Sequence, residues 1–154
     1  MAPPRLFTPE HIAPCGANCG LCSSYLAFTH EIPKKRGKIS HCSGCRTRNK
    51  QCGYLKGQCP PLAKGAITFC YECRNYPCSH LQNLDRRYRT MYGVSFIGNL
   101  EEIRDAGLKV FLAHQSRSFL CQKCRQDVIC VHNKKCYYCD RVTSWRSSTV
   151  RPRV

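Results

Sequence analysis

The sequence is poor in acidic side chains and has no long apolar run. Only 9 of its 154 residues are Asp or Glu, against 25 Lys and Arg. No apolar run approaches the roughly 20 residues that a transmembrane helix needs, so we expect no membrane association. The first ten residues are polar and contain three prolines, and they lack the apolar stretch of a secretory signal.

Familiar catalytic patterns are also missing. The chain has no recognisable catalytic triad, phosphate-binding loop or pair of acid–base carboxylates. Asp85, Glu101, Glu102 and Asp105 fall on predicted helices, where exposed surface charges are expected. The sequence therefore predicts no particular reaction, and whether the protein is an enzyme stays open.

Apolar residues are too few to form a large core unaided. The hydrophobic share is 42%, and that figure includes 15 cysteines. Small cores of this kind usually need metal ions or disulfides as supports. Pairs spaced Cys-x2-Cys recur along the chain, and one turn of this spacing can present two sulfurs to one metal ion. The pairs are 19/22, 42/45, 70/73, 121/124 and 136/139.

Disulfides are the alternative explanation for so many cysteines. An odd number of cysteines cannot all pair within one chain. The recurring two-residue spacing is typical of metal turns, and disulfide-rich domains are usually secreted. We therefore favour metal binding in a reducing cytoplasm.

The strongest local signal is the set Cys121, Cys124, Cys136 and Cys139. Two thiol pairs on a short hairpin can surround one zinc ion, and a single iron ion accepts the same geometry. We expect a zinc-ribbon-like β-hairpin here, with a strand around 128–131 and a return around 137–138. Between the pairs, Cys130 is expected to be a small buried residue and His132 a surface imidazole, because four thiols already complete a tetrahedron.

The ten cysteines of residues 15–78 are harder to assign. One set is Cys42, Cys45, Cys52 and Cys59, and another is Cys15, Cys19 and Cys22 with one of Cys70, Cys73 or Cys78. Interleaved sets are equally compatible with the spacing. Zn²⁺ is the first choice of metal, and [4Fe-4S] clusters at these N-terminal cysteines are the alternative. The Cys-x3-Cys-x2-Cys triad also matches radical S-adenosylmethionine enzymes, but the chain lacks the length and alternation of their barrel.

These signals predict a small α+β fold with a metal-stapled, irregular cysteine-rich core. Helices are expected at 21–31, at 79–92 from a Ser79–Gln82 capping box, at 99–106 and at 108–115. The expected organisation is a metal-binding domain at 12–94, a helical connector at 95–118, a zinc-ribbon-like module at 119–140 and a basic flexible tail at 141–154.

The formal charge of +16 suggests an anionic partner. Part of this charge balances metal-bound thiolates, because a zinc ion with four thiolates carries two negative charges. Basic residues at 34–38, 46–50 and 86–89, with Tyr54, Tyr71 and Tyr76, can bind phosphate and stack bases, or can form a solvated surface. Nucleic acid or a protein is thus the expected partner, and the oligomeric state is open.

The order of these motifs resembles an uncharacterised cysteine-rich domain family of bacteria and archaea. The resemblance covers roughly residues 12–140. It rests on Pro14-Cys15-Gly16 through Cys22, Cys42–Arg46, Phe69–Cys78, Arg87–Gly93, Asn99–Glu101 and the final run from Cys121 to Cys139. It implies zinc or iron–sulfur binding and no reaction. One departure is Arg125, which stands where a ribbon usually turns on glycine.

Together the patterns predict a metal-binding protein, with zinc as the metal, that acts as a binding or adaptor module. The alternative is an iron–sulfur protein with an electron-transfer or redox role.

Overall fold

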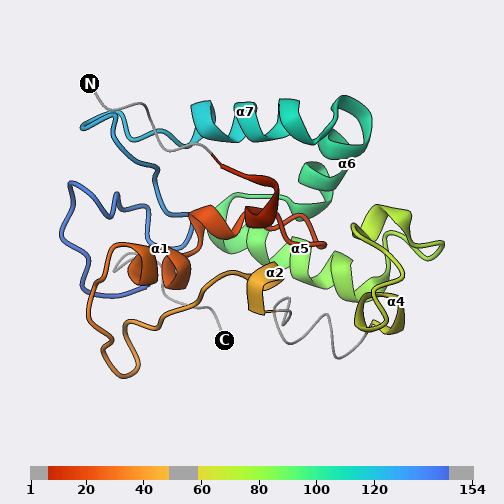
Figure 1. Ribbon diagram of the computed structural model, residues 1–154, viewed down its shortest axis with the longest axis horizontal. Coiled ribbons are helices and arrows are strands. Elements are labelled where there is room, and N and C mark those ends of the chain that lie inside the picture. Colours follow the sequence, from red (N-terminus) through yellow and green to blue (C-terminus); the bar gives the residue numbers. More distant parts are fainter. Residues whose placement is uncertain (1–6, 49–58, 146–154) are drawn as a thin grey trace.

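The computed structural model describes residues 7–48 and 59–145. In these residues the chain forms short helices joined by long irregular segments (Figure 1). The α-helices are α1 (Ser23–Thr29), α2 (Cys45–Arg48), α4 (Pro60–Ala63), α5 (Ser79–Tyr92), α6 (Phe96–Ala106) and α7 (Leu108–Ser118), and the 3-10 turns are η1 (Pro9–His11), η2 (Cys19–Leu21) and η3 (Cys70–Glu72).

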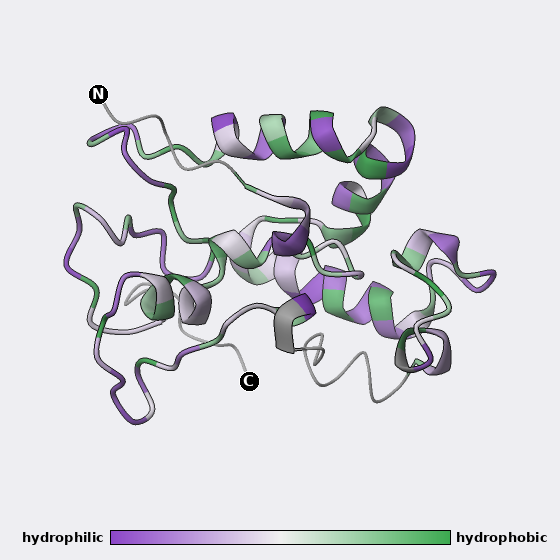
Figure 2. Cartoon of the chain, in the orientation of Figure 1, coloured by the Kyte–Doolittle hydropathy of each residue, from purple (hydrophilic) through white to green (hydrophobic). Residues whose placement is uncertain are grey.

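The three longest helices follow one another along the chain. Helix α6 packs against α5, α7 and η3, and therefore occupies the centre of the helical half. Figure 2 shows hydrophobic and hydrophilic residues alternating around α5 and α7, as expected for helices with one buried face. None of the helices in the described residues is long and apolar enough to cross a membrane.

The structure corrects the predicted cap of α5 and the predicted start of α6. Helix α5 begins after Cys78, and the predicted Ser79–Gln82 capping box is wrong because the Gln82 side chain donates to Pro77 O instead. Helix α6 begins three residues before the predicted start, because the Ser95 side chain accepts a hydrogen bond from Gly98 N at 2.9 Å. Gly93 ends α5 in the left-handed region, as the sequence predicts.

The predicted α+β class and its C-terminal β-hairpin are wrong. The described residues contain helices and isolated β-bridges, with no strand among them. In the C-terminal segment the two bridges join Leu120 to Val128 and Ile129 to Cys136. Tight turns follow each bridge, so the segment never runs extended long enough to form a ladder. The apolar residues around 128–131 instead point into a core.

Two apolar clusters hold the molecule together. The first lies between the N-terminal cysteine turns and the helices, with Ile12, Leu81, Leu100 and Phe111 almost completely buried. The second joins α1 to the C-terminal segment and consists of Phe7, Leu21, Leu26, Ala27, Val128, Cys130, Val131 and Tyr137. Apolar burial stabilises each cluster by roughly 25 cal/mol per Å².

Gly16 lets the first cysteine turn approach α6 closely. Its φ is +90°, and an added Cβ would lie 2.5 Å from Phe96 O. The carbonyl of Gly16 also accepts a hydrogen bond from the Asn99 side chain at 2.9 Å. A larger residue at position 16 would therefore separate the two segments.

Asp85 is not the exposed charge that the sequence predicts. Its side chain is buried and accepts hydrogen bonds from Ser95 Oγ at 2.8 Å and Ile97 N at 2.9 Å. Arg89, one helical turn later, forms an ion pair with it at 2.8 Å. The carboxylate thus fixes the start of α6 against α5.

Candidate metal centre

The four C-terminal cysteines meet at one point. The Sγ atoms of Cys121 and Cys139 lie 3.7 Å apart, as do those of Cys124 and Cys136, and all four sulfurs lie within 4.8 Å of one another. Four sulfurs placed tetrahedrally at 2.3 Å from a zinc ion are separated by about 3.8 Å. Sulfurs in a disulfide are about 2.05 Å apart, so these spacings fit a set of metal ligands and not a pair of disulfide bridges. The four cysteines can hold a metal ion.

Backbone hydrogen bonds shape the first thiol turn. Arg125 N donates to Cys121 O at 2.9 Å, and Gln126 N donates to Cys124 Sγ at 3.4 Å. Arg125 takes a φ of +55°, the left-handed conformation that glycine usually supplies. The substitution noted in the sequence is therefore accommodated, at a cost of about 1 kcal/mol.

Asp140 joins the second thiol turn to the first. Its backbone N–H donates to Cys136 O, and its carboxylate accepts from Cys136 N, each at 2.9 Å. The same carboxylate forms an ion pair with Lys123 in the first turn. This contact with Lys123, followed by the bond from Cys136, lowers the pKa of Asp140.

The four thiols differ electrostatically. Hydrogen bonds from the backbone N–H of Cys124, and then of Lys123, lower the pKa of Cys121 to about 7. Burial raises the pKa of Cys136 and of Cys139. A divalent cation favours ionisation of all four, since metal-bound cysteines are thiolates.

The two spacer residues lie apart from the four ligands. Cys130 is completely buried in the second apolar cluster, as predicted. His132 is also buried, so its predicted place on the surface is wrong. Its ring lies between Ser23 of α1 and Tyr88 of α5 and is hydrogen-bonded to both.

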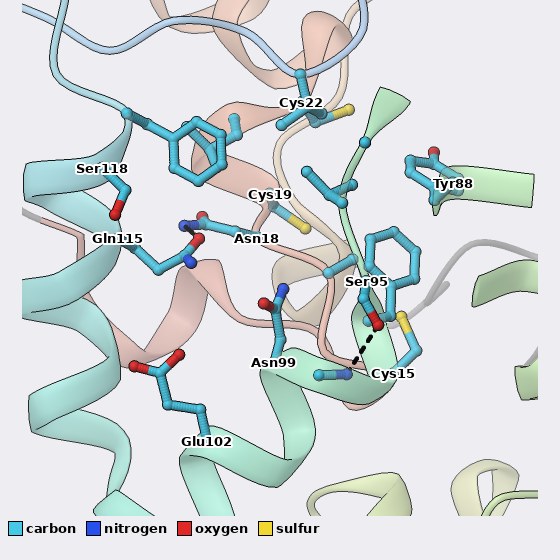
Figure 3. Close-up of a pocket in the computed structure, with 18 of the residues that line it drawn as sticks. Cys15, Asn18, Cys19, Cys22, Tyr88, Ser95, Asn99, Glu102, Gln115 and Ser118 are labelled. Atoms are coloured by element: carbon cyan, nitrogen blue, oxygen red, sulfur yellow. Dashed lines mark hydrogen bonds between the residues drawn. The ribbon is translucent and has the colours of Figure 1, made fainter. Parts of the chain in front are cut away.

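The N-terminal cysteines gather around a cavity. Cys15, Cys19, Cys22 and Cys45 line a cavity of about 390 Å³, which we call the thiol–amide cavity. Figure 3 shows the first three of these cysteines on one side of it. Cys45 N donates to Cys19 Sγ at 3.5 Å, so the structure brings together two residues from the two sets proposed on sequence alone. Contact with Cys45, and then burial, raises the pKa of Cys19, and burial raises that of Cys22 to about 11.

The remaining N-terminal cysteines that the structure describes do not line the thiol–amide cavity. Cys70 N donates to Pro14 O at 2.9 Å, which brings the third cysteine run beside Cys15. Cys59 and Cys78 pack against the first apolar cluster, while Cys42 and Cys73 are half-buried. Cys52 lies outside the described residues. Within those residues, only Cys121, Cys124, Cys136 and Cys139 form a set whose sulfurs all lie within 4.8 Å.

Several residues expected to bind phosphate or bases have other contacts. Arg46 Nη2 donates to Thr68 O at 3.0 Å, and its guanidinium lies 5.0 Å from the centre of the Phe69 ring. Tyr71 stacks on Phe69 at 5.5 Å. The predicted basic residues 49–50 and Tyr54 lie outside the described residues, as does the basic tail beyond residue 145.

Sequence reasoning missed the amide side chains of the thiol–amide cavity. Asn18 and Gln115 are both 6% exposed and lie 97 residues apart, yet Asn18 Nδ2 donates to Gln115 Oε1 at 3.3 Å. Helical spacing alone places Gln115 on the same side of α7 as Phe111. A glutamine on an apolar face is the signal that could have identified it.

Comparison with known proteins gives one match. A family model described as "Protein of unknown function (DUF3795)" matches residues 11–83, the part that holds the cysteines from Cys15 to Cys78. No curated protein and no solved structure matches the chain. The resemblance to an uncharacterised family is thus confirmed over residues 11–83, and the four-cysteine centre lies beyond the matched part.

Proposed function

We propose that the protein is a zinc-stabilised binding module with one structural zinc ion at Cys121, Cys124, Cys136 and Cys139. The observation that carries this proposal is the 3.7 Å spacing of the paired sulfurs, which matches the edge of a zinc tetrathiolate. All four tetrahedral positions are filled by protein, as is typical of structural sites. Catalytic zinc sites usually leave one position open.

Nucleic acid is the partner that the surface chemistry favours. A hollow of about 540 Å³ is lined by Lys34, Lys35, Arg36, Lys38, His41 and Trp145, together with Gly37, Ile39 and Ser40. Trp145 N donates to Lys38 O at 2.8 Å, which holds the indole beside the basic turn. Cations that attract phosphates and an aromatic ring that stacks on bases are the combination used for single strands.

Metal content and strand binding test the two parts of the proposal separately. Elemental analysis of protein purified without oxygen should give zinc, and removal of zinc by a chelator should unfold the protein. Fluorescence anisotropy should give binding of a labelled single strand that weakens steeply as salt rises. If the protein is colourless and contains zinc but binds no single strand at low salt, nucleic acid is excluded and another protein becomes the expected partner.

A matched pair of variants tests the basic hollow. The double variant Lys34→Gln/Lys38→Gln should reduce the slope of log affinity against log salt by about 1.4, at about 0.7 per lost phosphate contact. The control Lys64→Gln/Lys109→Gln removes the same charge from exposed lysines outside the hollow. Equal slopes for the two double variants would show that the hollow does not contact the strand.

An iron–sulfur site at the N-terminal cysteines is the second candidate. Cys15, Cys19, Cys22 and Cys45 share a cavity, yet within the described residues no three of them bring their sulfurs within 4.8 Å of one another. This wider spacing favours a cluster of several irons over a single ion, and the cluster would support a redox role. A brown anaerobic sample whose iron is lost in Cys19→Ser and kept in Cys130→Ser, with zinc kept in both variants, would support it.

A further inference from the structure

The thiol–amide cavity has a second side that the cysteines do not occupy. Figure 3 shows Cys15, Cys19 and Cys22 on one side, with Gln115, Ser118 and Glu102 facing them from α6 and α7. Its volume of about 390 Å³ falls within the range of roughly 300–1,000 Å³ that is usual for small-molecule sites. The side formed by α6 and α7 is therefore large enough to hold a ligand.

The charge around this cavity excludes anionic ligands. The chain has 25 Lys and Arg, yet none of them is among the described residues that line it. Glu102 lines it and is bonded to His114 at 2.8 Å, while burial lowers the pKa of His132 to about 4 and keeps its imidazole neutral. A phosphate or carboxylate would meet thiols and a Glu102 carboxylate whose partner is His114, with no Lys or Arg in the described lining, so a neutral ligand is favoured.

Carboxamides provide the polar contacts. Both polar atoms of the Asn18 side chain have a partner, because Oδ1 accepts from Gly20 N at 3.0 Å and Nδ2 donates to Gln115. Asn99 Nδ2 donates to Gly16 O at 2.9 Å. Within the part of the chain that the structure describes, no group bonds to Gln115 Nε2 or to Asn99 Oδ1. Gln115 is 6% exposed as a residue and lines the cavity, so its amide is held in place and Nε2 is open to a ligand there.

The other lining surfaces are flat and apolar. Phe96 is buried and lies 4.4 Å from Tyr88 between ring centres, and both rings line the cavity, as does Phe119. A planar ligand can contact these rings while its edge bonds to the carboxamides. One donor from Gln115 and one acceptor from Asn99 match an edge that offers an acceptor beside an N–H group, as the N6/N7 edge of adenine does.

We propose that the thiol–amide cavity binds a neutral nitrogen heterocycle of the nucleobase class, with Gln115 and Asn99 contacting its edge. The heterocycle is either a free nucleoside or a base within a single strand. The inference goes beyond the zinc proposal and needs zinc only for the folded protein. If the ligand is a free nucleoside, the inference also holds without nucleic acid as the partner.

Calorimetric titration of the purified full chain with adenosine tests the inference. We expect saturable binding with a dissociation constant of about 1 mM or lower, and at least about tenfold weaker binding in Gln115→Met. The matched control is a pair of serines on α7: Ser118→Leu narrows the cavity and should abolish binding, whereas Ser116→Ala lies outside the lining and should leave binding unchanged. Ser118 is exposed, so its variant stays informative if Gln115→Met does not fold.

A second titration distinguishes the two sources. A short thymine strand with one central adenine should bind more tightly than the same strand with an abasic position if the base comes from a strand, and equally if the free nucleoside is the ligand. Absence of adenosine binding together with equal binding of the two strands would overturn the inference. Binding that is unchanged in Ser118→Leu would also overturn it. Either result would leave zinc content and salt-dependent strand binding, and hence the proposed function, intact.

Discussion

The backbone N–H of Ser23 donates a hydrogen bond to Nδ1 of His132 at 3.2 Å, across 109 residues of chain. On the other side of the ring, Nε2 lies 3.1 Å from Tyr88 Oη. Because Nδ1 accepts, the neutral imidazole carries its proton on Nε2 and donates it to Tyr88. One buried ring therefore connects α1, α5 and the segment between the two thiol turns.

We expect His132 to make the protein less stable in acid. Burial, with a smaller contribution from Lys134, lowers the pKa of His132 from 6.5 to about 4. Between these values the unfolded chain binds a proton that the folded protein does not. The free energy of unfolding therefore falls as pH falls from 6.5 to 4, by about 3 kcal/mol in total.

Urea unfolding at several pH values checks this expectation. The variant His132→Gln cannot titrate, so its stability should fall less steeply over this range, although zinc loss affects both proteins alike. Parallel curves for the two proteins would contradict a buried neutral imidazole.

Removal of one metal ligand should destabilise the protein far more than removal of another buried thiol. Cys136 and Cys130 are both completely buried, six residues apart, but only Cys136 belongs to the four-sulfur set. Cys136→Ser should lose zinc and much of the roughly 10 kcal/mol that a structural zinc contributes to folding. Cys130→Ser should keep one zinc per chain, as measured by elemental analysis. Retention of zinc in Cys136→Ser would refute the assigned ligand set.

Removal of the buried Asp85 carboxylate should destabilise the protein more than removal of an exposed carboxylate. Asp85→Ala leaves the half-buried donors Ser95 Oγ and Ile97 N without their acceptor, and we expect the free energy of unfolding, measured by chemical denaturation, to fall by about 1–3 kcal/mol. Asp105 forms an ion pair with Arg104 on the surface, where water screens the charges, so Asp105→Ala should have no measurable effect. Similar losses for both variants would mean that Asp85 does not hold α6 in place.

The guanidinium of Arg46 should stabilise the fold through its planar shape as well as through its charge. It bonds to Thr68 O and lies over Phe69, so Arg46→Lys should lower the free energy of unfolding by about 1–2 kcal/mol. Arg74 is exposed, and Arg74→Lys should have no measurable effect. Thermal unfolding of the two variants gives the comparison. An Arg46→Lys variant as stable as the original protein would show that only the positive charge at this position matters.

Local patterns in the chain were enough to predict part of this architecture. Helical spacing and the glycine at position 93 indicated α5 almost to the residue, because amphipathic spacing and left-handed ends are local properties. The same local reasoning failed at residues 119–140. Alternation around 128–131 suggested a strand, but turns at Arg125 and Lys134, both with positive φ, limit the segment to isolated bridges.

The sequence by itself indicated that a small apolar core needs a metal as its support, and its spacing selected the four C-terminal cysteines whose sulfurs the structure brings together. Two thiols on one turn are neighbours whatever the remainder of the chain does. Only the tertiary structure decided that Cys45 lies against Cys19, that Asp85 and His132 are buried, and that Asn18 meets Gln115 beside a cavity. Those contacts join distant segments, and burial depends on how the helices pack rather than on the residues adjacent in sequence.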